Sequence, residues 1–519
     1  MVKISNNMEI KDQCWQQYQD GLEYQRKTGI IDNTLKAYRF YEGEQWYGLE
    51  SADESMPVYN FIMPLVKYKT AMIALNNMTI TYSAPSSNAR MRQIASALNG
   101  LAMARWERAK MDSVCWQVVR RAAIAGECYL YFYDGQGGCQ VIDNTNVFLA
   151  DEQQADLNAQ PYILFKERRI VDEVKKIAAK NGVSRSELEL IQPDDDDSTY
   201  IDESIKKCTC ILKLYLKEDG LHFFRCTKNV VFEPERVIKG LFSYPVAKLV
   251  FNTKYGTVRG QGEVLPLIPN QIEVNRSLAR RLINGKLSAY SRLIYSSDRV
   301  INPAALTEVG TAIEVESGGV NSINDAIGYL SPAPMSADAA SITTELMETT
   351  RELAGAGDAA LGNFNPELAS GVAIIAVRDQ AALPLNEQTA AFKQMVEDVA
   401  LIWYNLWAAY NPFGLTVISD GQKIVITEDE LKKLQPNIRV DVSSANPFSK
   451  YAREQSLGEL FQMGAITFDE YVWALDDDSS VPKTKLTEII KARAGVNAVS
   501  GQSDRIAEFA ARVKEEAGK

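Results

Sequence analysis

The chain has 519 residues and a net charge of −11, with 56 Lys and Arg against 67 Asp and Glu. Its single histidine, His222, excludes sites that need two histidines, such as HExxH zinc sites and two-histidine iron sites. The acidic balance argues against a protein that wraps DNA tightly, because such binding comes from Lys and Arg contacts to phosphates.

The composition is that of an ordinary globular protein, and the length predicts about three domains or one elaborate one. Residues 1–10 are polar, which predicts no signal peptide, and no apolar run approaches the roughly 18 residues that a membrane helix needs. The cysteines are odd in number and irregularly spaced. This predicts reduced thiols that act as small apolar side chains.

Hydrophobic periodicity and turn chemistry predict an α+β first half. Helices are expected over 8–48, 62–76, 87–125 and 170–191. Strands are expected over 79–82, 127–133, 139–142, 161–169, 209–216 and 221–227. Two pairs of these strands, 127–133 with 139–142 and 209–216 with 221–227, are expected to form hairpins.

The central region predicts two helices of similar length with a compact insert between them. The first is expected over 269–291, since Pro266 and Pro269 can start a helix but not lie inside one. The second is expected over 337–356. Together they predict an antiparallel helical hairpin with a small module at its tip.

A third helix is expected from Ser370, which can cap it, to about Tyr410. Pro384 lies within this stretch and is expected to kink or break the helix. Residues 413–445 have the composition of strands and turns, and residues 446–519 are expected to be mainly helical.

Candidate chemistry is sparse. The most notable cluster is Cys208-x-Cys210 with His222 and Cys226, which are possible zinc ligands. The hairpin geometry argues against a site, since Cys210 and His222 would lie on opposite faces. The glycine pairs in 260–262 and 355–357 complete no dinucleotide motif and are expected to be flexible turns. The acidic runs 194–197 and 476–478 are expected to be solvated loops.

Charge is distributed unevenly over the two central helices. The first carries Arg276, Arg280, Arg281, Lys286 and Arg292 against Glu273 alone, and the second carries Asp338, Glu345, Glu348 and Glu352 against Arg351 alone. The helices are expected to pair, within or between subunits, although each exposed ion pair contributes under about 1 kcal/mol. The alternative is that some of the basic residues face a polyanion.

Four features in chain order carry a resemblance to a known family. They are Tyr41-Glu42-Gly43-Glu44-Gln45-Trp46 with Pro57-x-Tyr59-Asn60; Lys254-Tyr255-Gly256 with Arg259-Gly260-Gln261-Gly262; the helix–insert–helix of 269–356; and Asn363–Pro366 with Ala369-Ser370-Gly371-Val372-Ala373 and the Pro-containing helix. In this order the chain resembles the portal proteins of tailed bacteriophages, which form dodecameric rings at one capsid vertex.

The resemblance implies an α+β, mainly helical fold with portal architecture. Its parts would be an α/β wing (1–257), stem helices (258–293 and 336–357), a small α/β clip (294–335), a tunnel loop (358–371), a Pro-kinked helix with the rest of the wing (372–445) and a helical crown (446–519).

The same resemblance implies a structural protein of the virion, assembled in the host cytoplasm, with no catalytic residue, metal or cofactor. A homo-oligomer would conduct double-stranded DNA during packaging and ejection. Its partners would be the large terminase, a head-completion or adaptor protein, and the major capsid and scaffolding proteins; no membrane is implied.

The implied tunnel loop contains no Lys or Arg. Its DNA-facing residues would be Asp358, Gly362, Asn363, Phe364, Asn365, Pro366 and Glu367. A conduit must hold DNA weakly, because each Lys or Arg contact to phosphate adds affinity and drag. The simpler alternative is an interhelical turn, but the connection is longer than two packed helices need.

Two rival functions stay open at this point. One is a multi-subunit scaffold with no DNA channel. The other is a hydrolase with Cys or Asp chemistry, although the sequence offers no nucleophile with an orienting base.

Overall fold

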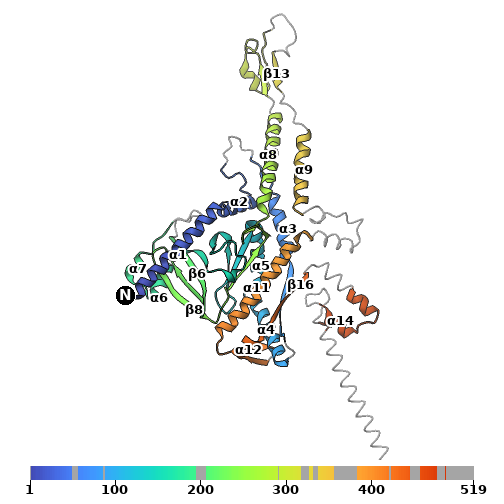
Figure 1. Cartoon of the computed structure of the whole chain (residues 1–519). Coiled ribbons are helices and arrows are strands. Elements are labelled where there is room, and N and C mark those ends of the chain that lie inside the picture. Colours follow the sequence, from blue (N-terminus) through green and yellow to red (C-terminus); the bar gives the residue numbers. More distant parts are fainter. Residues whose placement is uncertain are drawn as a thin grey trace, which may run out of the picture. The chain divides into compact units, whose positions relative to one another are not determined.

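The computed structural model describes residues 2–48, 56–85, 88–194, 206–289, 292–316, 326–330, 337–355, 383–419, 422–444, 456–475 and 485–486 (Figure 1). The chain divides into two compact units. The larger comprises Met1–Ala74, Met78–Ala369 and Ala376–Asp441, and the smaller comprises Leu75–Asn77, Ser370–Ile375 and Val442–Lys519.

Two antiparallel sheets form much of the larger unit. One has the order β4 (Val147–Leu149), β5 (Ile163–Ile170), β6 (Lys207–Lys217), β7 (Gly220–Cys226) and β8 (Val231–Lys239), and the other has the order β3 (Cys139–Asp143), β2 (Glu127–Phe132) and β9 (Val246–Val250). The pairs β2–β3 and β6–β7 are the two predicted hairpins. With antiparallel sheets and separate helices, the fold is α+β, as the sequence predicts.

The expected helix over 8–48 is in fact two helices, α1 (Val2–Lys27) and α2 (Ile30–Glu42). Gly29 separates them with φ 71°, a left-handed conformation that glycine adopts without steric cost. Helix α1 packs against the five-stranded sheet (Figure 1). The shared apolar cluster includes Cys14, Tyr18, Phe148, Leu164, Ile211 and Phe224.

The other two long predicted helices of the first half are also divided. The stretch 87–125 forms α4 (Ala89–Arg108) and α5 (Met111–Ala125), with Lys110 at φ 51° between them. The stretch 170–191 forms α6 (Val171–Lys180) and α7 (Arg185–Glu189), because Ser184 starts a new helix with a capping box. Periodicity continues across these breaks, which is why it does not reveal them.

Helices α3 (Ile62–Ala74), α5 and α11 (Asn386–Tyr410) contribute to the main apolar core together with β2 and β9. Trp403 and Trp407 of α11 are among its largest fully buried side chains. Tyr82, from β1 (Asn76–Ser83), is buried beside them and donates its hydroxyl to the backbone oxygen of Ala400 at 2.7 Å. Burial of these rings fixes α11 on the body of the larger unit.

The predicted helical hairpin is present. Helices α8 (Val264–Ala289) and α9 (Ala337–Leu353) lie side by side, and the tip carries the paired strands β12 (Arg292–Tyr295) and β13 (Ile327–Leu330) with the 3-10 turn Pro303–Thr307 (Figure 1).

The expected start of the first hairpin helix was wrong, because α8 begins before Pro266 and continues through Pro269. Pro266 lies in the first turn, where backbone N–H groups have no intrahelical partner. Pro269 removes one internal hydrogen bond. Burial of Val264, Leu267 and Ile268 on this turn offsets that loss.

After the hairpin, the next described residues form a 3-10 turn, Leu383–Leu385, that leads directly into α11. Pro384 lies in this turn; residues 370–382 fall outside the described residues, so the predicted kink stays a prediction. The predicted strand-and-turn region contains β14 (Leu415–Ser419), β15 (Gln422–Ile426), α12 (Glu428–Leu434) and β16 (Asn437–Ser444). Strand β16 pairs with β1.

In the smaller unit, the description covers a helical segment over 456–462 and α14 (Phe468–Ala474). Thr467 caps α14, since its hydroxyl accepts from the backbone N–H of Glu470 and the Glu470 carboxylate accepts from the backbone N–H of Thr467 at 2.8 Å. The predicted boundaries of the crown stay untested.

Candidate functional site

Arg259 precedes the hairpin and is almost completely buried. Its Nε and Nη2 donate to the two carboxylate oxygens of Glu152, both at 2.7 Å. Its Nη1 donates to Glu127 at 2.9 Å and to the backbone oxygen of Asn144 at 3.3 Å, and Nη2 also donates to the backbone oxygen of Val147 at 2.9 Å. All five donors of the planar guanidinium are therefore used, which holds the chain in one position.

The neighbours of this guanidinium keep it charged. Burial alone would lower the pKa of Arg259, but Tyr129, Glu127 and Glu152 together raise that pKa well above its usual value. The second oxygen of Glu127 accepts from the backbone N–H of Gly260 at 2.9 Å. The carboxylate thus holds both the side chain of Arg259 and the backbone that follows it.

Gly260 and Gly262 bring two stretches of backbone into direct contact. A Cβ on Gly260 would lie 2.3 Å from the backbone oxygen of Gly126, and a Cβ on Gly262 would lie 2.2 Å from the backbone oxygen of Ile124. Only glycine fits at these distances. The expectation of a flexible turn was therefore wrong, because the segment is packed tightly against the end of α5.

A buried network of amide groups holds α8 to the N-terminal region. Gln271 accepts from the backbone N–H of Phe61 at 3.2 Å and donates to the backbone oxygen of Tyr59 at 2.8 Å. Asn275, one turn further along α8, accepts from the backbone N–H of Tyr59 at 3.1 Å and donates to the side-chain oxygen of Gln45 at 2.6 Å. Both α8 side chains are buried, so these bonds are shielded from water.

The two parts of the first sequence motif, 41–46 and 57–60, are hydrogen-bonded to each other. The indole N–H of Trp46 donates to the backbone oxygen of Pro57 at 3.1 Å, and the side chain of Asn60 donates to the backbone oxygen of Tyr41 at 2.9 Å. The structure thus brings Gln45 and Tyr59 of the first motif to Gln271 and Asn275 on α8, far along the chain. Arg259 of the second motif is held instead by Glu127 and Glu152. Sequence reasoning singled out Gln45, Tyr59 and Arg259, but missed Gln271 and Asn275, which have no motif of their own.

The two hairpin helices contact each other through apolar and neutral polar side chains. Asn270 of α8 donates to the hydroxyl of Thr350 of α9 at 3.0 Å. Leu278 of α8 and Leu346 and Met347 of α9 are half-buried against the same apolar core. The side-chain contact that joins the two helices is thus a neutral hydrogen bond, with half-buried apolar side chains on both helices. Pairing of their opposite charges, within or between subunits, stays a prediction.

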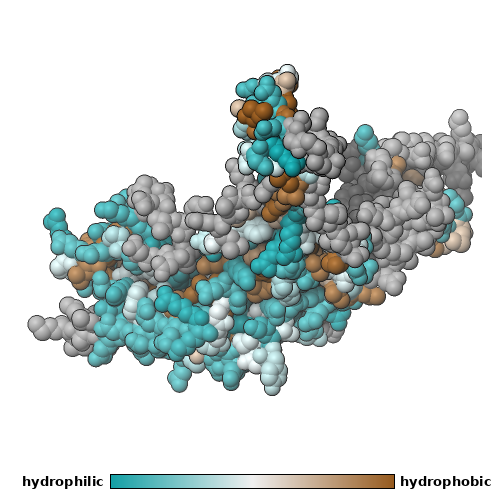
Figure 2. Space-filling view, turned by 90° about the horizontal axis from the view of Figure 1, so that it is seen from above, coloured by the Kyte–Doolittle hydropathy of each residue, from teal (hydrophilic) through white to brown (hydrophobic). Residues whose placement is uncertain are grey.

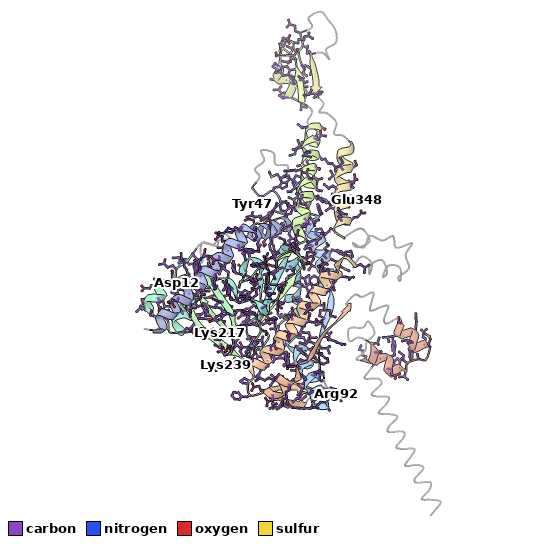
Figure 3. The ribbon with its side chains drawn as sticks, viewed as in Figure 1. Asp12, Tyr47, Arg92, Lys217, Lys239 and Glu348 are labelled. Atoms are coloured by element: carbon purple, nitrogen blue, oxygen red, sulfur yellow. The ribbon has the colours of Figure 1, made fainter. Side chains whose placement is uncertain are left out.

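The charged residues of the hairpin are exposed. Arg276, Arg280, Arg281 and Lys286 on α8 are exposed, as are Glu345, Glu348 and Glu352 on α9. Arg276 pairs with Glu273 of its own helix at 2.8 Å. Within the described residues, Arg280 and Arg281 have no ion-pair partner. Glu348 is labelled on α9 in Figure 3.

The tip module exposes several large apolar side chains. Ile294, Tyr295, Ile301, Val309, Tyr329 and Leu330 are each more than two-fifths exposed. On the face drawn in Figure 2, hydrophilic side chains cover most of the described surface and hydrophobic ones form smaller groups. Exposed apolar groups of this kind mark surfaces that contact other molecules.

The implied tunnel-loop residues, Asp358, Gly362, Asn363, Phe364, Asn365, Pro366 and Glu367, lie outside the described residues. Their expected role stays a prediction. The described chain ends before them at Gly355, whose nearest neighbour beyond the gap is the Pro384 side chain. Gly355 and Pro384, the described residues on either side of this segment, therefore lie close together.

His222, near the turn of the β6–β7 hairpin, is buried. Its Nδ1 lies 2.6 Å from Glu235 and its Nε2 lies 2.6 Å from Asp219. Tyr215 and Lys217 of β6 also donate to Glu235, at 2.5 and 3.0 Å, and Lys217 is labelled in Figure 3. Burial by itself would raise the pKa of Glu235, but these three hydrogen-bond donors lower it to about 2.

The cysteines confirm the predicted strand geometry. Cys208 and Cys210 pack on one face of the five-stranded sheet with Val174 and Phe232, whereas Cys226 packs on the other face with Cys14. His222 is paired with Tyr215, on the same face as Cys226. The described part of the chain contains no cluster of three or more His, Cys, Asp or Glu side chains that could hold a metal.

A cavity of about 950 Å³ lies between the end of β8, α11 and α12. Ser243, which lines it, is hydrogen-bonded to the side-chain amide of Asn405 at 3.1 Å. The charged residues Glu428 and Lys432 on its wall pair with each other at 2.5 Å. An amide cannot act as a general base, so this hydrogen bond does not activate the serine as a nucleophile.

In the described residues, no helix is both long enough and apolar enough to cross a membrane. No known protein-family model and no curated protein sequence matches the chain. The geometry of the hairpin and its base therefore provides the ground for a functional proposal.

Proposed function

We propose that this chain is a phage portal protein. It would form a homo-oligomeric, dodecameric ring at one capsid vertex and provide the channel through which double-stranded DNA passes in packaging and ejection. The observation that carries the proposal is the hairpin of α8 and α9, which bears a separate module at its tip and is fixed at its base by buried polar contacts. Such a rigid, repeated element suits the wall of a ring.

The parts of the chain have distinct roles in this proposal. The hairpin is the stem, and the tip module with its exposed apolar side chains is the clip that docks the large terminase and later the adaptor protein. The α/β body is the wing, and the segment 358–371 is the tunnel loop. Capsid and scaffolding proteins would contact the ring during assembly in the host cytoplasm.

Weak DNA contact is consistent with the chemistry of the chain. The net charge is −11 and the loop segment 358–371 contains no Lys or Arg. Each phosphate contact by Lys or Arg would strengthen salt-dependent binding and oppose sliding. An acidic channel protein therefore conducts DNA without retaining it.

Negative-stain electron microscopy of the purified full-length protein tests the proposal. A ring of about twelve copies with a central hole is the expected result. A closed assembly without a hole would favour a scaffold that has no channel. A monomer at all concentrations, or a monomer with hydrolytic activity, would overturn the proposal.

A further inference from the structure

The hairpin carries opposite charges on its two helices, and these charges face away from the packed side of each helix. Arg276 and Arg280 lie two residues before and two residues after Leu278. In an α-helix this places both about 160° around the axis from Leu278, which packs toward the core. The two arginines therefore lie on the outer side of α8.

The acidic residues of α9 share one face in the same way. Glu345, Glu348 and Glu352 recur at intervals of three and four residues, within about 40° of the direction opposite Thr350. Thr350 is buried and accepts the hydrogen bond from Asn270 of α8. The acidic stripe therefore faces away from α8.

One residue of each face, Arg276 and Glu345, lies at a similar height along the hairpin. Measured along the helix axes from the Asn270–Thr350 contact, Arg276 is about 9 Å away and Glu345 is about 8 Å away in the same direction. The basic face also carries the exposed apolar side chain of Leu287, within about 20° of both arginines around the helix axis. A single hairpin thus presents an exposed basic surface on α8 and an exposed acidic surface on α9.

We infer that α8 of one copy packs against α9 of the next copy, with Arg276 and Arg280 facing Glu345 and Glu348. Because the two surfaces differ, the contact is heterologous and repeats head to tail, which closes into a ring when the rotation permits. The inference rests on the proposed ring and assigns the residues that join its subunits. A second copy is favoured over a polyanion because the complementary surface is present on every copy.

Two charge-reversal variants test the contact. The basic-face variant carries Arg276→Glu and Arg280→Glu, and the acidic-face variant carries Glu345→Lys and Glu348→Lys. Each should weaken assembly about tenfold or more, because like charges then meet at every junction. A matched control, Lys176→Glu with Lys180→Glu on exposed positions of α6, should assemble like the wild type.

Mixing the two variants separates contacts between copies from contacts within one copy. Co-expressed basic-face and acidic-face variants should regain oligomers that contain both chains in equal amounts, because each junction then joins opposite charges. Native mass spectrometry measures the composition. If the charges paired within one hairpin, each variant would repel itself and mixing would restore nothing.

The outcomes distinguish this inference from the proposed function. Wild-type protein that forms no ring would overturn the proposed function. Wild-type rings with reversal variants that assemble normally would overturn only the inference. Rings that assemble normally but lose salt-sensitive binding of double-stranded DNA in the basic-face variant would assign Arg276 and Arg280 to a polyanion instead.

Discussion

The guanidinium of Arg259 lies 2.9 Å from the carboxylate of Glu127, with 4% and 2% of the two side chains exposed. This buried pair lies at the point where the chain leaves the α/β body and enters α8. Removing one member of a buried ion pair leaves an uncompensated charge, which is far more costly than losing an exposed pair.

We therefore expect Arg259→Met to lower the free energy of unfolding by about 3–5 kcal/mol. Urea unfolding measures the change. Lys27→Met is the matched control, since its pair with Glu23 is largely exposed and its loss should cost under about 1 kcal/mol. Equal effects of the two substitutions would contradict the role given to Arg259.

Gly262→Ala should destabilise the protein by more than about 2 kcal/mol, because its Cβ would meet the backbone oxygen of Ile124 at 2.2 Å. Gly285→Ala on α8 provides the comparison. It meets no atom within 4 Å, and alanine is favoured in a helix by about 0.5–1 kcal/mol, so it should stabilise. The midpoint of thermal unfolding should fall in the Gly262→Ala protein and rise in the Gly285→Ala protein. A Gly262→Ala protein as stable as wild type would show that this close packing is not required.

Asn275→Ala should cost about 1–3 kcal/mol, since it leaves the backbone N–H of Tyr59 and the buried side chain of Gln45 without their partner. Ser288→Ala, at an exposed position of the same helix, should change the free energy of unfolding by less than about 0.5 kcal/mol. Limited proteolysis near residues 45–60 supplies an independent measurement. Cleavage there should increase in the Asn275→Ala protein and not in the Ser288→Ala protein.

Glu235 should contribute a pH-dependent part of the stability. Its pKa falls from 4.5 to about 2 in the folded protein, so its contribution is present above about pH 4.5 and is lost as the pH falls toward 2. Glu235→Gln should lower the thermal midpoint at neutral pH, and the difference from wild type should disappear near pH 2. Glu218→Gln, at an exposed position nearby, is the control and should leave the thermal midpoint unchanged. A difference in thermal midpoint between Glu235→Gln and wild type that is independent of pH would contradict this assignment.

Deletion of 362–368 should leave ring assembly intact and impair DNA packaging or retention, because the proposed role of this segment is to touch DNA rather than to join subunits. Electron microscopy measures assembly, and the DNA content of purified particles measures packaging. Normal packaging by the deletion variant would count heavily against a tunnel loop.

Local patterns predicted the elements better than their ends. The alternation in 127–142 and 209–227 predicted both hairpins, because register there depends on nearby residues. The breaks at Gly29 and Lys110 were missed, since apolar periodicity continues across them. The start of α8 was predicted wrongly at Pro269, because burial of the neighbouring residues outweighs the local penalty for proline inside a helix. That burial is a tertiary effect.

By itself, the sequence determined the α+β class, the hairpin with its tip module, the separation of Cys210 from His222, and the opposite charges of α8 and α9. These properties follow from composition and from periods of two or 3.6 residues. Only the tertiary structure decided that Arg259 pairs with Glu127, that Asn275 joins Gln45, and that both charged faces of the hairpin point outward. Such contacts join residues more than a hundred positions apart, and no local pattern specifies which distant partner a buried polar group will find.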